Sequence, residues 1–431
     1  MAVSEAPKQA DLDKCVHCGL CLNSCPTYRQ LGLEMDSPRG RIYQMVQVAT
    51  GVSEITESYR QHIDLCLACR GCETACPSGV QYGRLVEAAR AHIEQKVERP
   101  WHERLVRNFV FGHLLQSPKL LRMAGNGLHF FASSGLQGLV RRSGILKFAG
   151  NLAAVEALSP SAEKPFFFDQ IGKVFPARGE RKHRVAFFAG CIANVSFARL
   201  NEATVRVLQK NGCEVTIPSG QGCCGALHVH SGLKEMARGL ARTNIDAVMD
   251  GNFDAFITNA AGCGSTLKEY DELLEHDAAY HGKAVQFIAR MKDITEFLGS
   301  IELNKQFGEL NVTITYQDSC HLAHGQKIRA APRKLLNAVP GILFKEMALA
   351  DLCCGSAGIY NVMHTEMAGQ LLESKMQSVN GTGAEWIVTA NPGCMIQLQA
   401  GAQKHGKGQQ VLHVVEVLDK SYSNAEAGET P

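Results

Sequence analysis

Two cysteine runs near the start of the chain have the spacing of iron–sulfur ligands. Both read C-x2-C-x2-C-x3-C-P, and their cysteines are Cys15, Cys18, Cys21 and Cys25, then Cys66, Cys69, Cys72 and Cys76. Four thiolates at this spacing bind one [4Fe–4S] cube, and the fourth Cys of each run usually binds the other cube. We therefore expect two cubes, whose ligands are a first set of Cys15, Cys18, Cys21 and Cys76 and a second set of Cys66, Cys69, Cys72 and Cys25.

A pair of zinc knuckles is the alternative for these runs. Zinc sites favour two separated C-x2-4-C pairs, whereas each run offers three close cysteines and a fourth, so iron–sulfur is favoured. Arg39, Arg41 and Arg70 lie beside the runs. Guanidinium groups near an anionic cluster could tune its potential, and solvated surface arginines are the alternative.

Eight further cysteines form a pattern that occurs twice. They are Cys191, Cys223, Cys224 and Cys263, followed by Cys320, Cys353, Cys354 and Cys394 at offsets of 129, 130, 130 and 131 residues. Such regularity predicts an internal duplication and two similar subdomains that pack together. The glycine after each adjacent pair lets the backbone turn sharply, so that both thiols can face one point. We expect at least one further cluster or metal site here, with buried free thiols as the alternative.

Other residues near this pattern have simpler interpretations. Cys213 meets Ile342 at the repeat offset, and an aliphatic partner predicts a core residue. Four histidines flank the cysteine loops. We interpret them as structural residues, and the alternative is that they act as secondary ligands or proton carriers. They are His228, His230, His321 and His324.

The elements that must position the cysteines differ along the chain. Helical patterns surround the two runs, including a helix that begins at Ser37-Pro38 and another over residues 82–97. Beyond residue 180, strands predicted at 184–189, 214–217, 255–258, 312–316, 342–346 and 386–390 alternate with helices. The cysteines then follow strand carboxyl ends, as in α/β folds with parallel sheets.

The predicted fold class is α+β and multidomain. Its parts are an all-helical ferredoxin-like domain (1–100), a basic helical linker (101–180), two α/β Cys-Cys-Gly subdomains (181–305, the first half, and 306–420, the second half) and a flexible tail (421–431).

Composition excludes several classes of protein. The 431 residues carry a net charge of +2, which shows no bias toward nucleic acid. Seventeen cysteines at metal-like spacings do not form a small disulfide scaffold, and ligands that must stay reduced favour the cytoplasm. The polar N-terminus lacks the apolar region of a secretory signal. The chain has no G-x-G-x-x-G motif and no evident acid–base pair, so we expect neither flavin nor NAD and no catalytic residue.

Residues 104–155 are basic and contain no Asp or Glu. The cations are Arg104, Arg107, Lys119, Arg122, Arg141, Arg142 and Lys147, and a predicted helical stripe contains Val106, Phe109, Val110, His113 and Leu114. A basic amphipathic segment too polar to span a bilayer is typical of a protein that lies on a membrane surface. An interface with another subunit is the alternative.

The chain resembles the iron–sulfur subunits of bacterial glycolate oxidase over nearly its whole length. The motifs that carry the resemblance are HCGLC, SCPTY, SPRGRIY, CLACRGCETACPSGVQY, GCCGA, GCG, KEY, LCCGSAG and VTANPGC. Each half also resembles the Cys-Cys-Gly domain of heterodisulfide reductases, in which the last Cys opens a C-x-x-C pair. Thr266 and Gln397 occupy the position of the second Cys here, which puts disulfide-cleaving chemistry in doubt.

The resemblance implies an electron-transfer subunit of an oxidoreductase that acts on a CH–OH group. Flavin-binding partner subunits would oxidise glycolate to glyoxylate, and the electrons would pass through the clusters to a membrane acceptor, with quinone expected. The implied location is the cytoplasm, peripheral on the inner face of the membrane. The alternatives are a subunit for lactate or glycerol-3-phosphate oxidation, a thiol–disulfide enzyme of the heterodisulfide reductase kind, and a zinc protein with structural knuckles.

Overall fold

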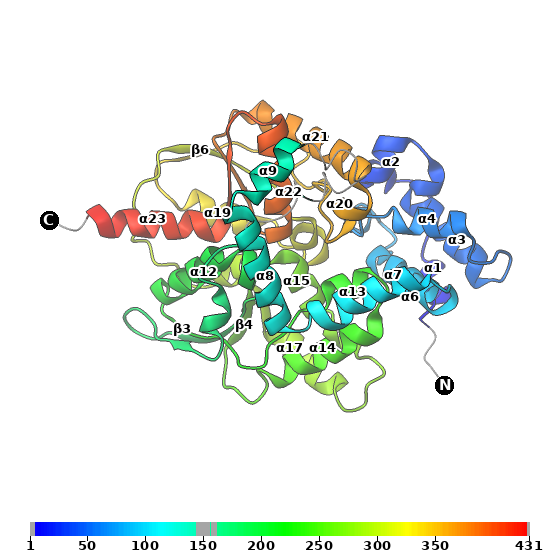
Figure 1. The fold of residues 1–431 in the computed structure, drawn as a ribbon, viewed down its shortest axis with the longest axis horizontal. Coiled ribbons are helices and arrows are strands. Elements are labelled where there is room, and N and C mark those ends of the chain that lie inside the picture. The colour runs from blue at the N-terminus through cyan, green and yellow to red at the C-terminus, as the bar shows by residue number, and fades with distance from the viewer. Residues whose placement is uncertain (1–4, 144–155, 157–161, 429–431) are drawn as a thin grey trace.

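The structure is a computed structural model that describes residues 5–143, 156 and 162–428 of the chain. Figure 1 shows the N-terminal helices at one end of the molecule and the two halves stacked beside them. The described residues before 144 form helices and turns and contain no strand. Mixed helix and sheet content agrees with the predicted class.

The N-terminal helices surround both cysteine runs. They are α1 (Gln9–Leu12), α2 (Pro26–Leu31), α3 (Pro38–Ala49), α4 (Glu57–Asp64), α5 (Gly71–Thr74) and α6 (Tyr82–Lys96), with short turns η1 (Leu22–Ser24) and η2 (Glu34–Asp36). The side chain of Ser37 accepts a hydrogen bond from the Gly40 N–H, and Pro38 occupies the first helical position, as the sequence predicts. Leu12, Ile42 and Leu85 are among the residues of the core that these helices share.

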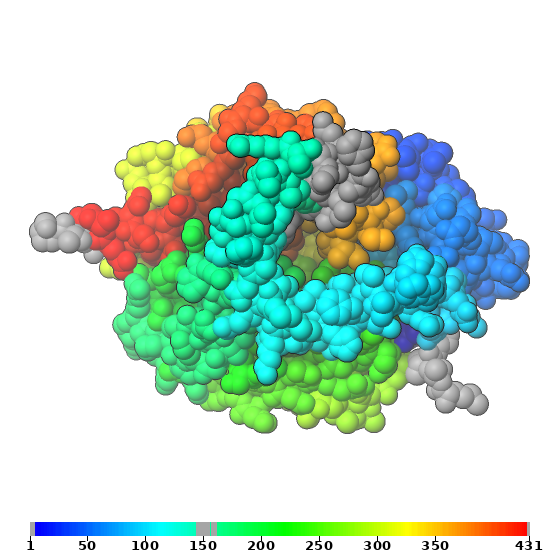
Figure 2. All heavy atoms as spheres, viewed as in Figure 1, coloured from blue at the N-terminus to red at the C-terminus, as the bar shows by residue number. Residues whose placement is uncertain are grey.

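The next segment crosses one face of the molecule (Figure 2). It consists of α7 (Trp101–Arg107), the π-helix η3 (Asn108–Leu114), α8 (Pro118–Ser133) and α9 (Leu136–Ser143). The residues of the predicted apolar stripe do not share one face, because Val106 and Phe109 are exposed whereas Val110 and Leu114 pack against the buried group that contains Phe111. The Leu115 N–H donates to the Val110 carbonyl, an i→i−5 bond that changes which side chains face inward.

Neither Lys147 nor most of the stretch after α9 falls within the described residues. No helix in the part of the chain that the structure describes is long and apolar enough to cross a bilayer.

The two sheets have the same strand order, apart from one additional edge strand, β1, in the first sheet. The first sheet contains β1 (Val174–Phe175), β2 (His183–Phe188), β3 (Cys213–Thr216), β4 (Ala255–Thr258) and β5 (Met291–Asp293), in the order β1-β3-β2-β4-β5. The second contains β6 (Val312–Tyr316), β7 (Ile342–Phe344), β8 (Trp386–Thr389) and β9 (Gln410–His413), in the order β7-β6-β8-β9. All pairings are parallel except that of β1 with β3. The duplication predicted from the cysteines is therefore present in the fold.

Helices connect and cover these strands. In the first half they are α11 (Ala193–Ser196), α12 (Ala198–Lys210), α13 (Ala226–His230), α14 (Lys234–Asp246), α15 (Ala261–Leu267), α16 (Tyr270–Leu273), α17 (His281–Arg290) and α18 (Ile294–Ser300), preceded by the turn η5 (Phe167–Gln170). In the second half they are η6 (His321–Gly325), α19 (Ala330–Asn337), α20 (Tyr360–Met363), α21 (Thr365–Thr382), α22 (Pro392–His405) and α23 (Val414–Gly428).

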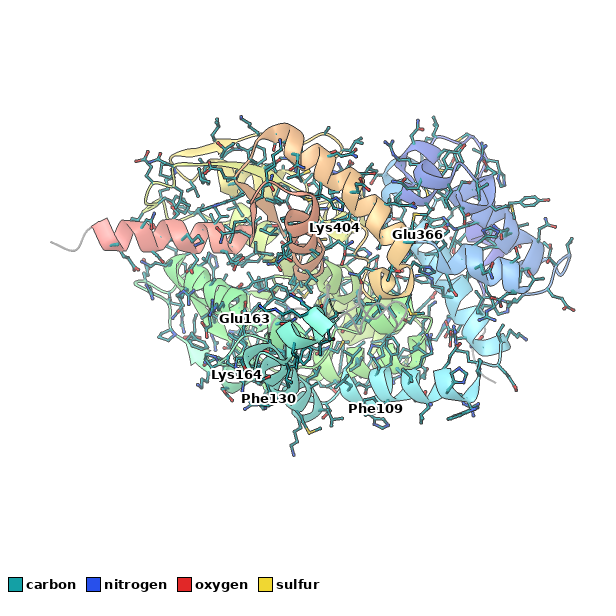
Figure 3. The ribbon with its side chains drawn as sticks, turned by 45° about the horizontal axis from the view of Figure 1, so that its top comes forward. Phe109, Phe130, Glu163, Lys164, Glu366 and Lys404 are labelled. Atoms are coloured by element: carbon teal, nitrogen blue, oxygen red, sulfur yellow. The ribbon has the colours of Figure 1, made fainter. Side chains whose placement is uncertain are left out.

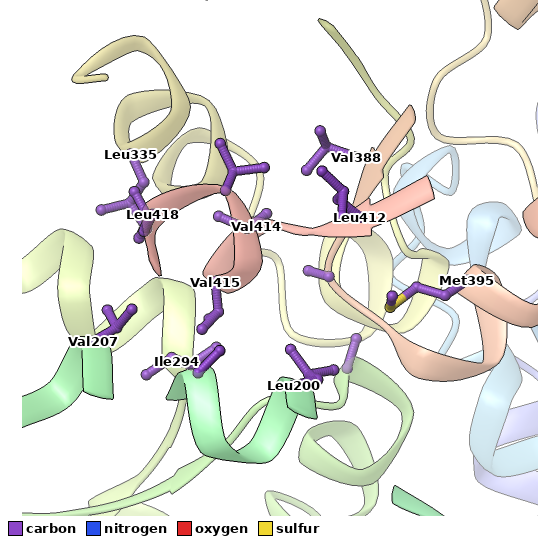
Figure 4. Close-up of a cluster of buried hydrophobic side chains, with 14 of the residues drawn as sticks. Leu200, Val207, Ile294, Leu335, Val388, Met395, Leu412, Val414, Val415 and Leu418 are labelled. Carbon is purple, nitrogen blue, oxygen red and sulfur yellow. The ribbon is translucent and has the colours of Figure 1, made fainter. Parts of the chain in front are cut away.

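The two halves share one hydrophobic core. In Figure 4, Leu200 and Val207 of α12 lie beside Val415 of α23, and all three belong to the same buried group. Residues 421–428, predicted as flexible tail, continue α23 as a helix. The prediction fails there because Tyr422 packs into the core and its hydroxyl donates to the Asn304 carbonyl.

Candidate metal centres

The cysteines of the two halves lie just beyond the carboxyl ends of parallel strands. In the first half, Cys191 follows β2, the pair Cys223-Cys224 follows β3, and Cys263 is in α15 after β4. In the second half, Cys320 follows β6, Cys353-Cys354 follows β7, and Cys394 is in α22 after β8. This is the edge of an α/β sheet where the loops of adjacent strands meet.

In the first half the four thiols form a row of contacts. Cys191 Sγ lies 3.5 Å from Cys223 Sγ. The Cys223 side chain is hydrogen-bonded to that of Cys224, and Cys224 to that of Cys263. The hydrogen bond with Cys223, together with burial, raises the pKa of the Cys191 thiol well above its usual range.

The four thiols of the second half form the same row of contacts, and they are more buried than those of the first half. Side-chain hydrogen bonds connect Cys320 with Cys353, Cys353 with Cys354, and Cys354 with Cys394. All four are buried, whereas Cys191 and Cys263 of the first half are only half-buried. The hydrogen bond with Cys354, and then burial, raises the pKa of the Cys394 thiol. A metal would therefore have to displace protons from these thiols on binding.

The second half also supplies donors to its sulfurs. The Gly355 N–H donates to Cys353 Sγ at 3.5 Å, and Asn391 Nδ2 donates to Cys394 Sγ at 3.4 Å. Such N–H groups stabilise a thiolate once the proton has left. The residues of this half therefore fit a metal–thiolate group.

The second set of the N-terminal runs lines a single small cavity. Cys25, Cys66, Cys69 and Cys72 all face it. Arg41, Arg70 and several apolar residues complete the wall. Cys66 Sγ accepts a bond of 3.4 Å from the Ala68 N–H. Four thiols, a backbone donor and two cations around one cavity fit an anionic [4Fe–4S] cube.

The arginines beside the runs are not solvated surface groups throughout. Arg41 is 1% exposed, with Nη2 3.2 Å from Asp36 Oδ1 and Nη1 4.0 Å from Cys25 Sγ. Arg70 is ion-paired with Glu73 at 3.1 Å and with Glu269. The surface interpretation is therefore wrong for Arg41, which is buried beside Asp36, and for Arg70, which pairs with two carboxylates.

The first set lies nearer the surface. Cys15, Cys21 and Cys76 are half-buried against the core of the N-terminal helices, and Cys18 is exposed. The Arg39 guanidinium closes this region by donating to the His17 carbonyl at 3.1 Å and by pairing with Glu34 at 2.7 Å. The two sets thus differ in their distance from solvent.

The second set lies directly against the second half. Cys353 and Cys69 are close enough that a negative charge on Cys353 raises the pKa of the Cys69 thiol, after the larger effect of burial. Leu67, between Cys66 and Cys69, packs in one buried group with Cys320 and Cys353. Sequence reasoning did not predict this junction, because it depends on how two separately folded parts pack.

The four histidines hold the parts together. Of these, His321 donates from Nε2–H to the Ala68 carbonyl at 3.2 Å, and its ring stacks on that of His230 with the ring centroids 5.1 Å apart. His230 in turn bonds to Glu87 at 3.0 Å. His228 bonds to the Phe111 carbonyl at 2.9 Å and His324 to Thr74 at 2.8 Å. Cys213 is fully buried in the shared core, as predicted.

One charged residue near the cysteines was missed in the sequence. Lys375 of α21 is buried next to the Cys353-Cys354 loop. A comparison of the two halves position by position could have found it, because the first half has Asn244 at the equivalent place.

Family models match three parts of the chain. A 4Fe-4S dicluster domain matches residues 11–80, which contain both cysteine runs. The linker region of the glycolate oxidase iron-sulfur subunit matches residues 102–159, and a cysteine-rich domain matches twice, at 185–268 and 314–399. The chain therefore carries [4Fe–4S] clusters in its N-terminal part and two copies of a cysteine-rich domain after it.

Curated relatives cover almost all of the chain. A probable glycolate oxidase iron-sulfur subunit of Bacillus subtilis is 42% identical over 420 residues, 96% of this chain and 95% of that protein. The glycolate oxidase iron-sulfur subunit of Escherichia coli is 34% identical over 422 residues, 95% and 94% of the two chains. Lactate utilization protein A of Oceanobacillus iheyensis is 30% identical but matches only 55% of this chain, with 96% of its own length. The chain belongs to the family of glycolate oxidase iron–sulfur subunits.

Proposed function

We propose that this protein is the electron-transfer subunit of a flavin-dependent glycolate oxidase. A flavin-binding partner would oxidise glycolate, and this chain would conduct the electrons to an acceptor at the membrane. The observation that carries the proposal is that Cys69 packs against the buried group that contains Cys320 and Cys353, so that the N-terminal thiols adjoin those of the second half. A relay needs such neighbouring redox sites, and [4Fe–4S] clusters supply one-electron chemistry when bound.

The first set would hold the outer cube and the second set the inner one. Support for the second set comes from the single cavity that Cys25 shares with Cys66, Cys69 and Cys72, although Cys25 belongs to the other run. This helical part would be a ferredoxin-like domain at residues 1–100, followed by the linker (101–180) and the two Cys-Cys-Gly subdomains (181–305 and 306–420).

A further cluster would bind the second half, through Cys320, Cys353, Cys354 and Cys394. Support comes from the four buried thiols of this half and from the N–H groups that donate to Cys353 Sγ and Cys394 Sγ. The row of the first half has the same order and is the second candidate.

The segment from α7 to α9 would face the membrane, with quinone as the acceptor. Large apolar side chains project from it: Phe109 and Phe130 lie on its outer surface (Figure 3), at 53% and 64% exposure. Arg104, Lys119 and Arg142 provide positive charge beside them. Anionic headgroups attract each such cation by about 1 kcal/mol. This arrangement supports a peripheral location on the inner face of the cytoplasmic membrane.

The test is to purify this chain alone and together with its flavin-binding partner. Only the complex should reduce a soluble quinone analogue with glycolate, and lactate should be a poor substitute. Turnover of glycolate by this chain alone would contradict the relay role. Preference for lactate or glycerol 3-phosphate would contradict the assigned substrate and leave the relay intact.

A further inference from the structure

Lys375 is a buried cation beside the cysteines of the second half. Lys375 is 4% exposed, and its Nζ donates to the Leu349 carbonyl at 2.6 Å and to the Ala350 carbonyl at 3.2 Å. Both carbonyls lie in the loop that leads to Cys353. No ion pair joins Lys375 to a carboxylate among the residues that the structure describes. A buried ammonium without a countercharge is costly, since carbonyls provide hydrogen bonds but no net charge.

The ionisable groups near enough for a negative charge on them to act on Lys375 are Cys354, Cys353, Asp351 and Asp318. Both carboxylates already have partners: Asp318 binds Arg333 at 2.7 Å, and Asp351 binds Arg329 at 3.2 Å. The cysteines alone remain without a cation. A neutral thiol offers Lys375 no compensation, whereas a metal-bound thiolate does.

The first half has a neutral residue at this place. Helices α14 and α21 begin at Lys234 and Thr365, 131 residues apart, which is also the offset between Cys263 and Cys394. At that offset Lys375 corresponds to Asn244. Asn244 Nδ2 donates to the Cys223 carbonyl at 2.9 Å, and its Oδ1 accepts from the Gly222 N–H at 2.9 Å. Each side chain thus holds its own cysteine loop, but only Lys375 brings a charge.

We propose that Lys375 is the internal countercharge of an anionic metal–thiolate group held by the second half, and that the first half lacks such a charge. The inference rests on the proposed function, because it assumes a cluster on Cys320, Cys353, Cys354 and Cys394. A fixed cation in a poorly solvated site favours the more negative, reduced form of a bound group. The second half, whose buried group with Cys320 and Cys353 packs against Cys69, is therefore the half tuned to accept electrons from the N-terminal cubes.

The test compares Lys375→Gln, which keeps a donor and removes the charge, with Lys375→Arg, which keeps the charge. Iron and acid-labile sulfide per chain and the midpoint potentials of all clusters would be measured on the full-length protein. For Lys375→Gln we expect one couple to become about tenfold harder to reduce, a fall of about 59 mV for one electron. Lys375→Arg should stay close to the wild type. Unchanged potentials and iron content in Lys375→Gln would overturn the proposal.

Two controls separate this inference from its premises. Cys354→Ala should lower iron content; if it does while Lys375→Gln changes nothing, the cluster is real and the countercharge role is wrong. If Cys354→Ala keeps full iron content, the second half holds no cluster and both ideas fail. Lys375→Gln should also leave the metal-free chain as resistant to urea as the wild type, because the uncompensated charge is gone. Equal destabilisation with and without metal would mark a purely structural lysine and overturn the proposal.

Discussion

At the scale of single residues, Arg41 is a buried cation in the wall of the cavity that would hold an anionic cluster. A buried guanidinium is costly unless carboxylates and hydrogen bonds surround it. Asp36 supplies the carboxylate at 3.2 Å, and the His62 carbonyl accepts from Nε at 2.6 Å. The remaining Nη1 contacts Thr27 Oγ1 at 3.1 Å and Cys25 Sγ at 4.0 Å. Arg41 is thereby held in one position, facing the cavity that the second set lines.

Cys25→Ser tests whether the runs exchange their fourth ligands. Serine removes the thiolate that the second set would take from the first run, so the inner cube should lose iron and its paramagnetic signal. The outer cube should keep its signal, since Cys15, Cys18, Cys21 and Cys76 are untouched. Cys76→Ser is the matched variant and should give the opposite pattern. Loss of the outer signal alone in Cys25→Ser would contradict the exchange.

Cys213→Ala separates a packing cysteine from a ligating one. Cys213 is 0% exposed in β3, so the variant should lose about 1–2 kcal/mol of unfolding free energy and keep all its iron. Cys224→Ala and Cys354→Ala should instead lower the iron content or the rate of electron transfer. If iron analysis finds the same content in all three variants, neither half holds a metal.

At the scale of elements, the sequence predicted the strands that precede the cysteines and missed β1, β5 and β9. The missed strands are short, and Met291-Lys292-Asp293 and Gln410–His413 have polar residues at their ends. Only pairing with β3, β4 and β8 makes β1, β5 and β9 strands. The same limit applies to η3, where a wider turn changed the face that Phe111 and Phe109 present. The local sequence pattern was enough to predict the loops that carry the cysteines. The missed edge strands of the two sheets form only through tertiary packing, which the local pattern does not contain.

His413, at the end of β9, predicts a pH effect on the second half. Its Nδ1 accepts from the Val415 N–H at 3.1 Å and so caps α23, and burial lowers its pKa from 6.5 to about 4. The unfolded chain therefore binds an extra proton between these values. The contribution of His413 to the unfolding free energy is therefore complete above its pKa in the unfolded chain. It is lost as the pH falls toward its lower pKa in the folded chain.

The variant His413→Gln should accordingly be less stable than the wild type at neutral pH. The difference in unfolding free energy between the wild type and the variant should shrink by about 1 kcal/mol near pH 5.5. At that pH the unfolded wild type gains a proton on His413, which the folded wild type does not bind and the variant lacks. Urea unfolding of both proteins at the two pH values measures this. A deficit that stays constant with pH would show that His413 does not titrate in this way.

The segment from α7 to α9 predicts binding to anionic vesicles. Charge reversal at Arg141 and Arg142 should weaken co-sedimentation, with the larger effect from Arg142, since Arg141 already pairs with Glu156 at 2.9 Å. Phe109→Ser should weaken it as well, and high salt should reduce binding of the wild type. Lys345→Glu, outside this segment, is the control. A wild-type protein that stays in solution at low salt would make the segment a subunit interface instead.

At the scale of the whole molecule, the N-terminal helices are tied to both halves. Arg70 reaches Ser265 at 3.3 Å in the first half, and His321 of the second half bonds to the Ala68 carbonyl at 3.2 Å. The two halves are further joined by their shared core and by the ion pair of Arg206 with Asp419 at 2.7 Å. These ties hold the cysteine groups at fixed separations, which electron transfer between buried sites requires. The motifs predicted the groups, but only the packed chain shows that they adjoin.

The most direct test of the relay is to follow electrons through the purified complex after rapid anaerobic mixing with glycolate. The flavin of the partner should be reduced first, and the iron–sulfur clusters of this chain should follow before any quinone analogue is reduced. In the Cys25→Ser complex with normal flavin content, flavin reduction should keep its rate while reduction of the quinone analogue collapses. Reduction of the analogue at the wild-type rate in that complex would contradict the account.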